Sequence, residues 1–121
     1  MLLEALVACS GVTLKAVASA LDVPIETGKV RAEGDLDFRG TLGVDKTAPV
    51  GFKAIRLSFD LKMKKGAEVD EEKITKLGKL TERYCVVLQT IAKKPELQVR
   101  VDGTGETEDG IERSVAWAQK V

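Results

Sequence analysis

The sequence predicts an α+β fold in which an antiparallel sheet packs on two main helices. Three observations predict it: a strongly apolar stretch with helical spacing near the N-terminus, two segments with an apolar residue at every second position, and a second amphipathic helical segment further on. The 121 residues suit one domain, which we expect to span residues 1–121, and the pattern leaves open whether its tail, residues 103–121, is helix or strand.

The first helix is expected over residues 2–21, where apolar residues recur every three or four positions. Glu4 and Lys15 are its only charged residues, so most of its surface must be covered. The stretch has no basic segment before it, which argues against a signal peptide, and its two charges disfavour a membrane span. We expect a buried helix of a cytoplasmic protein that ends near Asp22 and Pro24.

Strands are expected where apolar and polar residues alternate. The segment from Lys29 to Arg39 alternates in this way, and the segment from Lys53 to Lys64 is the clearest case in the sequence. Residues 40–51 between them are expected to form a loop. Leu97, Val99 and Val101 indicate a third strand.

The second helical region lies between the last two expected strands. Asp70 is a suitable N-cap, an apolar stripe follows from Leu77 to Ile91, and the helix is expected to break near Cys85 and to end before Pro95. Three strands cannot easily cover both sides of the apolar first helix. A second copy of the chain is the simplest cover, so the sequence predicts a homodimer.

Composition excludes several function classes. Nineteen basic and nineteen acidic residues balance, and no run of like charge indicates a nucleic-acid or membrane partner. The chain has no histidine, so it lacks the commonest general base and metal ligand, and two cysteines alone are too few for a zinc site. No phosphate-binding loop is present. We therefore expect no metal site.

Cys9 and Cys85 are the residues with the most distinctive chemistry. They lie too far apart in the sequence for a local CxxC redox turn. In a reducing compartment, two cysteines are more often free or redox-active than a structural crosslink. The alternative is that both are buried and inert, because free cysteine is among the most buried residue types.

Two segments resemble the cysteine motifs of the OsmC/Ohr family, the osmotically inducible and organic hydroperoxide resistance proteins. Residues 6–14, Leu-Val-Ala-Cys-Ser-Gly-Val-Thr-Leu, are similar to its first cysteine helix, and residues 81–85, Thr-Glu-Arg-Tyr-Cys, resemble its second motif. The strand expected between them fits the order of elements in the family. The resemblance extends over about residues 2–102.

This resemblance implies a thiol-dependent peroxidase that reduces organic hydroperoxides. Cys9 would be oxidised to a sulfenic acid, and Cys85 would condense with it to a disulfide. An external dithiol reductant, of the dihydrolipoyl type in the best-known branch, would restore the thiols without a cofactor. The resemblance also implies an intertwined homodimer.

The sequence departs from the family pattern ahead of Cys9. The family's N-terminal β-hairpin is absent, so its arginine that lowers the thiol pKa has no matching position. Arg83, close to Cys85, and Arg56, on a predicted strand, are the candidates to replace it. An alternative function is therefore a non-catalytic dimer of the same fold that acts as a binding or structural module with inert thiols.

Overall fold

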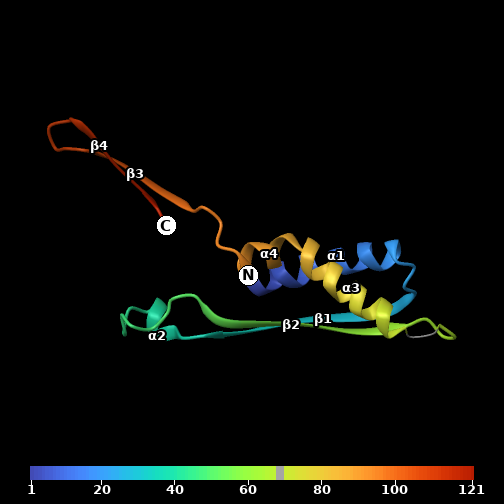
Figure 1. Ribbon diagram of the computed structural model, residues 1–121. Helices are drawn as coiled ribbons and strands as arrows, with labels where there is room; N and C mark the ends of the chain where they lie inside the picture. Colours follow the sequence, from blue (N-terminus) through green and yellow to red (C-terminus); the bar gives the residue numbers. More distant parts are fainter. Residues whose placement is uncertain (68–69) are drawn as a thin grey trace.

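The computed structural model describes residues 1–67 and 70–121 and has the predicted α+β architecture (Figure 1). The two strands of the first sheet are antiparallel and adjacent in sequence, as expected. The elements in chain order are α1 (Leu2–Ala20), β1 (Ile25–Leu36), α2 (Phe38–Thr41), β2 (Phe52–Met63), α3 (Glu71–Tyr84), α4 (Val86–Ala92), β3 (Gln98–Glu106) and β4 (Glu112–Lys120).

The first sheet is a long two-stranded ribbon of β1 and β2. Val30 pairs with Phe59 and Ala32 with Leu57, so the apolar residues of the two strands share one face. Along β2 the odd-numbered residues from Ile55 to Met63 are half-buried and the even-numbered ones are exposed, which confirms the predicted alternation. Helices α1, α3 and α4 all lie on one side of this ribbon (Figure 1).

The core forms where α1 and α3 meet the first sheet. Leu14 and Ala18 of α1 pack with Leu77 of α3 and with Val23 of the turn into β1. Phe59 and Leu61 of β2 complete this cluster from the sheet side. Burial of these side chains is the main source of stability of the helical layer.

Helix α1 is buried along a single row, formed by Leu6, Ser10, Leu14 and Ala18. These residues are four positions apart and face α3, β1 and α4, against which α1 packs. Two members of the row are small, which lets the neighbouring elements approach closely. By length and composition α1 could cross a membrane, which is weak evidence because core helices pass the same test.

The end of β1 differs from the predicted strand. Phe38 and Arg39 were expected in a strand that runs to Arg39, but the strand ends at Leu36 and both residues lie in the short helix α2. The Asp37 carboxylate accepts the backbone N–H of Arg39, and this local cap turns the chain into a helix. The expected loop therefore begins after α2.

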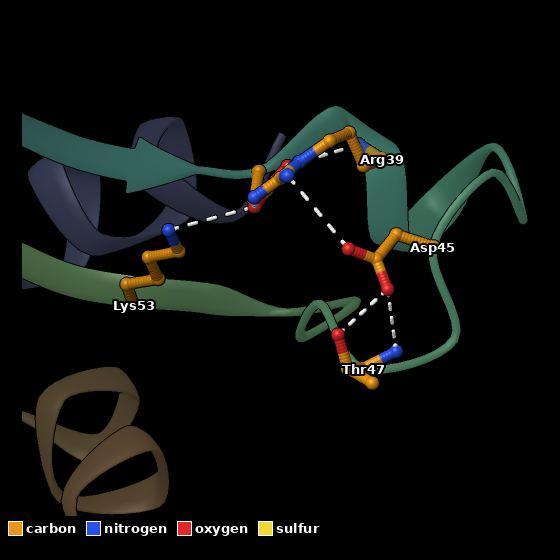
Figure 2. Close-up of polar contacts among 5 residues, drawn as sticks. Arg39, Asp45, Thr47 and Lys53 are labelled. Atoms are coloured by element: carbon orange, nitrogen blue, oxygen red, sulfur yellow. Dashed lines mark hydrogen bonds and ion pairs between the residues drawn. The ribbon is translucent and has the colours of Figure 1, made fainter.

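An ion-pair network holds the α2 region (Figure 2). The Asp37 carboxylate lies 2.8 Å from the Arg39 guanidinium and 3.6 Å from the Lys53 ammonium. Hydrogen bonds from Arg39 hold the pKa of Asp37 well below its usual range. Asp45 accepts hydrogen bonds from the backbone N–H and the hydroxyl of Thr47, at 2.9 and 2.6 Å. Because its charges are paired with one another, we assign this cluster a structural role.

The second helical region is divided as predicted. Asp70 caps α3 by accepting the backbone N–H of Glu72 at 3.0 Å. Cys85 has extended backbone angles, with φ of −74° and ψ of 111°, so it ends α3 and is the N-cap of α4. The thiol of Cys85 is thereby fixed at a joint between two helices.

The expected third strand is present as β3, and the undecided tail forms a fourth strand, β4. The two pair into a separate antiparallel hairpin, which corrects the expectation of three strands. Every residue of both strands is exposed. The hairpin extends away from the helices and the first sheet (Figure 1).

Candidate active site: a pair of thiols

Cys9 lies in the middle of α1, on the side that meets α4. Its side chain is half-buried, and both cysteines are free thiols. Helix α1 packs against α4, and the backbone N–H groups of Val87 and Val86 at the start of that helix lower the pKa of the Cys9 thiol. The sulfur therefore lies where backbone donors have no partner within their own helix.

Cys85 is next to Cys9 and is fully buried, with 0% of its surface exposed. Burial raises the pKa of the Cys85 thiol, because a thiolate loses its hydration there. A hydrogen bond to Cys9 raises this pKa further. These shifts favour the protonated form at Cys85.

The pKa of Cys9 is shifted in the opposite direction. The hydrogen bond from the Val87 backbone N–H lowers it most, and the Cys85 thiol, the Val86 N–H and the Thr13 hydroxyl lower it further, against an opposing effect of burial. Hydrogen bonding to the charged form thus favours a thiolate at Cys9 and a thiol at Cys85. This asymmetry is what an attacking and a resolving sulfur require.

The two arginines proposed from sequence lie elsewhere in the described part of the chain. Arg56 forms ion pairs with Asp35 at 3.0 Å and with Glu33 at 3.6 Å on the exposed face of the first sheet. The Arg83 guanidinium lies over the ring of its neighbour Tyr84, 5.5 Å from the centroid. Neither arginine is among the groups that lower the pKa of Cys9.

A comparison of the sequence with models of protein families finds one match. The family model described as OsmC-like protein matches residues 1–100, which include both cysteines. The chain belongs to the OsmC-like family. A search of curated protein sequences finds no significant match. Membership suggests a peroxiredoxin-like or related function, and proteins of the family typically form dimers.

The site of this OsmC-like chain includes groups that sequence reasoning missed. The backbone N–H groups of Val86 and Val87 leave no signal in side-chain identity, so only the fold could reveal them. Thr13 could have been found, because it follows Cys9 by four positions in a helix. Its hydroxyl donates to the Cys9 carbonyl at 2.9 Å and lies beside the sulfur.

An apolar groove of about 250 Å³ lies between β2 and the helices α1 and α4 of the OsmC-like chain. Leu6, one turn before Cys9, lines it. The other main lining residues are apolar and come from β2 and α4: Phe52, Ile55, Leu57, Leu88 and Ile91. The groove therefore shares both of its helices with the thiol pair.

No cluster of three or more metal-ligating side chains occurs within residues 1–67 and 70–121. Two neighbouring thiols can in general undergo nucleophilic attack by a thiolate and disulfide formation.

Proposed function

We propose that this chain is a thiol-dependent peroxidase that reduces organic hydroperoxides through Cys9 and Cys85. The observation that carries the proposal is that Cys9 and Cys85 act on each other's pKa and that the two pKa values shift in opposite directions. An inert structural pair of cysteines would need neither the backbone donors on Cys9 nor the protonated neighbour.

In the first step the Cys9 thiolate attacks the outer oxygen of the hydroperoxide. An S–O bond forms with an electron pair from sulfur while the O–O bond breaks, and the alkoxide that leaves takes a proton from water. Cys9 is oxidised to a sulfenic acid and the hydroperoxide is reduced to an alcohol. The N–H groups of Val86 and Val87 hold the thiolate in place for this attack.

In the second step the sulfur of Cys85 attacks the sulfenic sulfur of Cys9. An S–S bond forms, the S–O bond breaks, and the hydroxide that leaves takes the Cys85 proton to form water. An external dithiol of the dihydrolipoyl type then exchanges with the disulfide. The dithiol is oxidised to its own disulfide and both cysteines return to thiols.

The apolar groove supports an organic hydroperoxide over hydrogen peroxide as the substrate. Its lining is apolar apart from Lys53, so it offers mostly apolar surface to an alkyl chain. The sequence named Arg83 and Arg56 as candidates for a cation that assists Cys9. Because neither arginine is among the groups that lower the pKa of Cys9, the proposal gives that task to backbone N–H groups instead.

We also propose that the chain acts in the cytoplasm as a homodimer, with residues 1–121 as one OsmC-like domain. One row of α1 is buried within the single chain, while Leu2 and Val12 on its remaining surface are 43% and 72% exposed. A second copy would cover this apolar surface.

Intact-mass measurement after treatment with an alkyl hydroperoxide tests the peroxidase proposal. The wild-type protein is expected to lose two hydrogens through a Cys9–Cys85 disulfide and to regain them with a dithiol. Cys9→Ser, the matched variant, should show no such loss. An unchanged wild-type mass with both thiols still open to alkylation would refute the proposal and favour the binding-module alternative.

A further inference from the structure

A second cavity lies where α3 ends and α4 begins. It is an open hollow of about 450 Å³, lined by residues that lie between Arg83 and Pro95 in the sequence. We call it the α4 hollow. Its lining includes Cys85, the proposed resolving cysteine. A molecule that occupies the α4 hollow therefore lies directly beside one of the two proposed reactive residues.

The α4 hollow and the apolar groove lie on different faces of α4. Leu88 and Ile91 line the groove, whereas Val86, Gln89 and Lys93 line the hollow. Positions three or four residues apart share one face of a helix, so the two sets of residues form separate faces. The two cavities can therefore be occupied by different molecules.

The α4 hollow has a positive charge. Arg83 and Lys93 line it, and none of its lining residues is acidic. Both side chains are exposed, and neither takes part in an ion pair within residues 1–67 and 70–121. The Arg83 guanidinium lies over the ring of Tyr84, 5.5 Å from its centroid, and this contact holds the cation beside the cavity. Two unpaired cations at one open cavity favour an anionic ligand.

The other side chains of the α4 hollow limit what such a ligand can be. The Gln89 amide donates to the Glu82 carbonyl and the Thr90 hydroxyl donates to the Val86 carbonyl, each at 2.7 Å, so these donors are already used. Tyr84 and Val86 are 59% and 71% exposed and offer apolar surface. The lining thus suits a small molecule with a short apolar body and an acidic group.

We propose that the α4 hollow binds the external reductant, and that this reductant is an anionic dithiol whose carboxylate pairs with Arg83 and Lys93. The inference rests on the proposed peroxidase function and names the substrate class of its second half-reaction. A neutral dithiol could use the apolar surface but not the two cations. Arg83, which the sequence suggested as a partner of Cys9, instead serves the reductant.

The α4 hollow brings the dithiol to Cys85 rather than to Cys9. One thiolate of the dithiol attacks the Cys85 sulfur of the disulfide, an S–S bond to Cys85 forms, and Cys9 leaves as a thiolate with the electron pair of the broken bond. Cys9 is the better leaving group, because its pKa is lowered and a thiol of lower pKa leaves faster.

The second sulfur of the dithiol completes the exchange. It attacks the dithiol sulfur that is bound to Cys85, and the new S–S bond closes the dithiol into a cyclic disulfide. Cys85 leaves and takes up one of the two dithiol protons, and the other proton goes to water. The dithiol loses two electrons and the protein disulfide gains them.

Dihydrolipoate and dihydrolipoamide are matched probes for this inference. They carry the same dithiol and differ only in a carboxylate against a neutral amide. The disulfide of the whole chain is prepared with diamide, which does not depend on the peroxidase step, and the return of the thiols is followed by intact mass at low salt. An exposed ion pair strengthens binding by up to about fivefold, so dihydrolipoate should react on the order of tenfold faster. This advantage should shrink as salt is added.

Three variants test which residues hold the carboxylate. Arg83→Gln and Lys93→Gln should each lower the ratio of the two rates by about threefold, and the double variant should bring the ratio close to one. Lys94→Gln makes the same change of charge at the next residue, outside the lining, and should change the ratio by less than about twofold. A variant that merely loses structure would change both rates together and leave their ratio as it is.

Three results would overturn the inference. Equal rates for the two dithiols with the wild type would show that the reductant is not selected by charge, and a ratio that survives in the double variant would place the carboxylate elsewhere. Failure of diamide to form the disulfide would overturn both the inference and the peroxidase proposal. Disulfide formation by diamide but not by an alkyl hydroperoxide, with the predicted ratio, would refute the peroxidase proposal alone.

Discussion

Replacing Thr81 by valine should make the protein more stable. Thr81 lies in α3, four positions before Cys85, and only 2% of its surface is exposed. Its hydroxyl oxygen is buried without a hydrogen-bond partner among the described residues. Thr81→Val keeps the branched shape of the side chain and removes only the hydroxyl, so the cost of burying an unpaired polar group is removed with it.

The expected gain follows from the burial of this hydroxyl. An unsatisfied buried polar group costs about 1–3 kcal/mol, whereas threonine and valine differ little in helix propensity. We expect the free energy of unfolding of Thr81→Val to rise by about 1–2 kcal/mol. With a urea dependence of about 1.5 kcal/mol/M, the unfolding midpoint should rise by about 1 M.

Thr13→Val is the matched control, because the Thr13 hydroxyl has a partner. It donates to the Cys9 carbonyl at 2.9 Å, so its loss should lower the free energy of unfolding by about 1 kcal/mol. The Thr13 side chain also lowers the pKa of Cys9, so the variant should raise that pKa. Urea unfolding followed by circular dichroism gives the stability, and the pH dependence of Cys9 alkylation gives the pKa.

The decisive result is that the free energy of unfolding rises in Thr81→Val and falls in Thr13→Val. If Thr81→Val instead loses 1 kcal/mol or more, its hydroxyl is paired with a group such as a buried water. The reasoning from an unpaired hydroxyl would then be wrong, even if Thr13→Val behaves as expected.

Four further outcomes are expected. Leu77→Ala, at a core residue that is 1% exposed, should lower the free energy of unfolding by about 3 kcal/mol in urea. Gly40→Ala should destabilise the protein by about 1–3 kcal/mol, because a Cβ would collide with the backbone of the following loop, whereas Gly51→Ala should be neutral by the same measurement. Arg56→Ala should leave the rate of Cys9 alkylation unchanged, since Arg56 does not act on that thiol, and a large drop would contradict the geometry. In the wild type, alkylation of Cys9 should rise with pH about a midpoint below that of the urea-unfolded chain. Because its pKa is lowered by folding, the Cys9 thiolate stabilises the fold above the unfolded pKa, and this contribution is lost as pH falls through the folded pKa.

The regular elements could be predicted because their patterns are local. Alternation from Ile55 to Met63 reflects a strand with one covered face, and the structure has β2 there within one residue of the expected ends. The Asp70 cap was predictable for the same reason, since the carboxylate bonds to a backbone N–H two residues away. A break of the second helical region near Cys85 was also expected, and the structure has Cys85 between α3 and α4.

Features set by contacts between distant segments could not be predicted. The alternation from Lys29 to Arg39 suggested one continuous strand, but Asp37 caps a new helix and pairs with Lys53 across the α2 loop. The donors on Cys9 belong to the backbone of α4, which no side-chain motif encodes. Strand β4 was undecided for a different reason. It pairs with its neighbour β3, but every residue of both strands is exposed, so no buried face marks the strand in the sequence.

Cys85 is both the proposed resolving thiol and the residue that separates α3 from α4. Its extended backbone angles allow α3 to stop and α4 to start, and its sulfur is sealed off from water. A disulfide with Cys9 would pull on the residue that connects α3 and α4. We therefore expect the angle between the two helices to change when the thiols are oxidised. A substitution at Cys85 would change the connection between the two helices as well as the thiol chemistry. A substitution at Cys9 therefore tests the thiol chemistry with less effect on the helices.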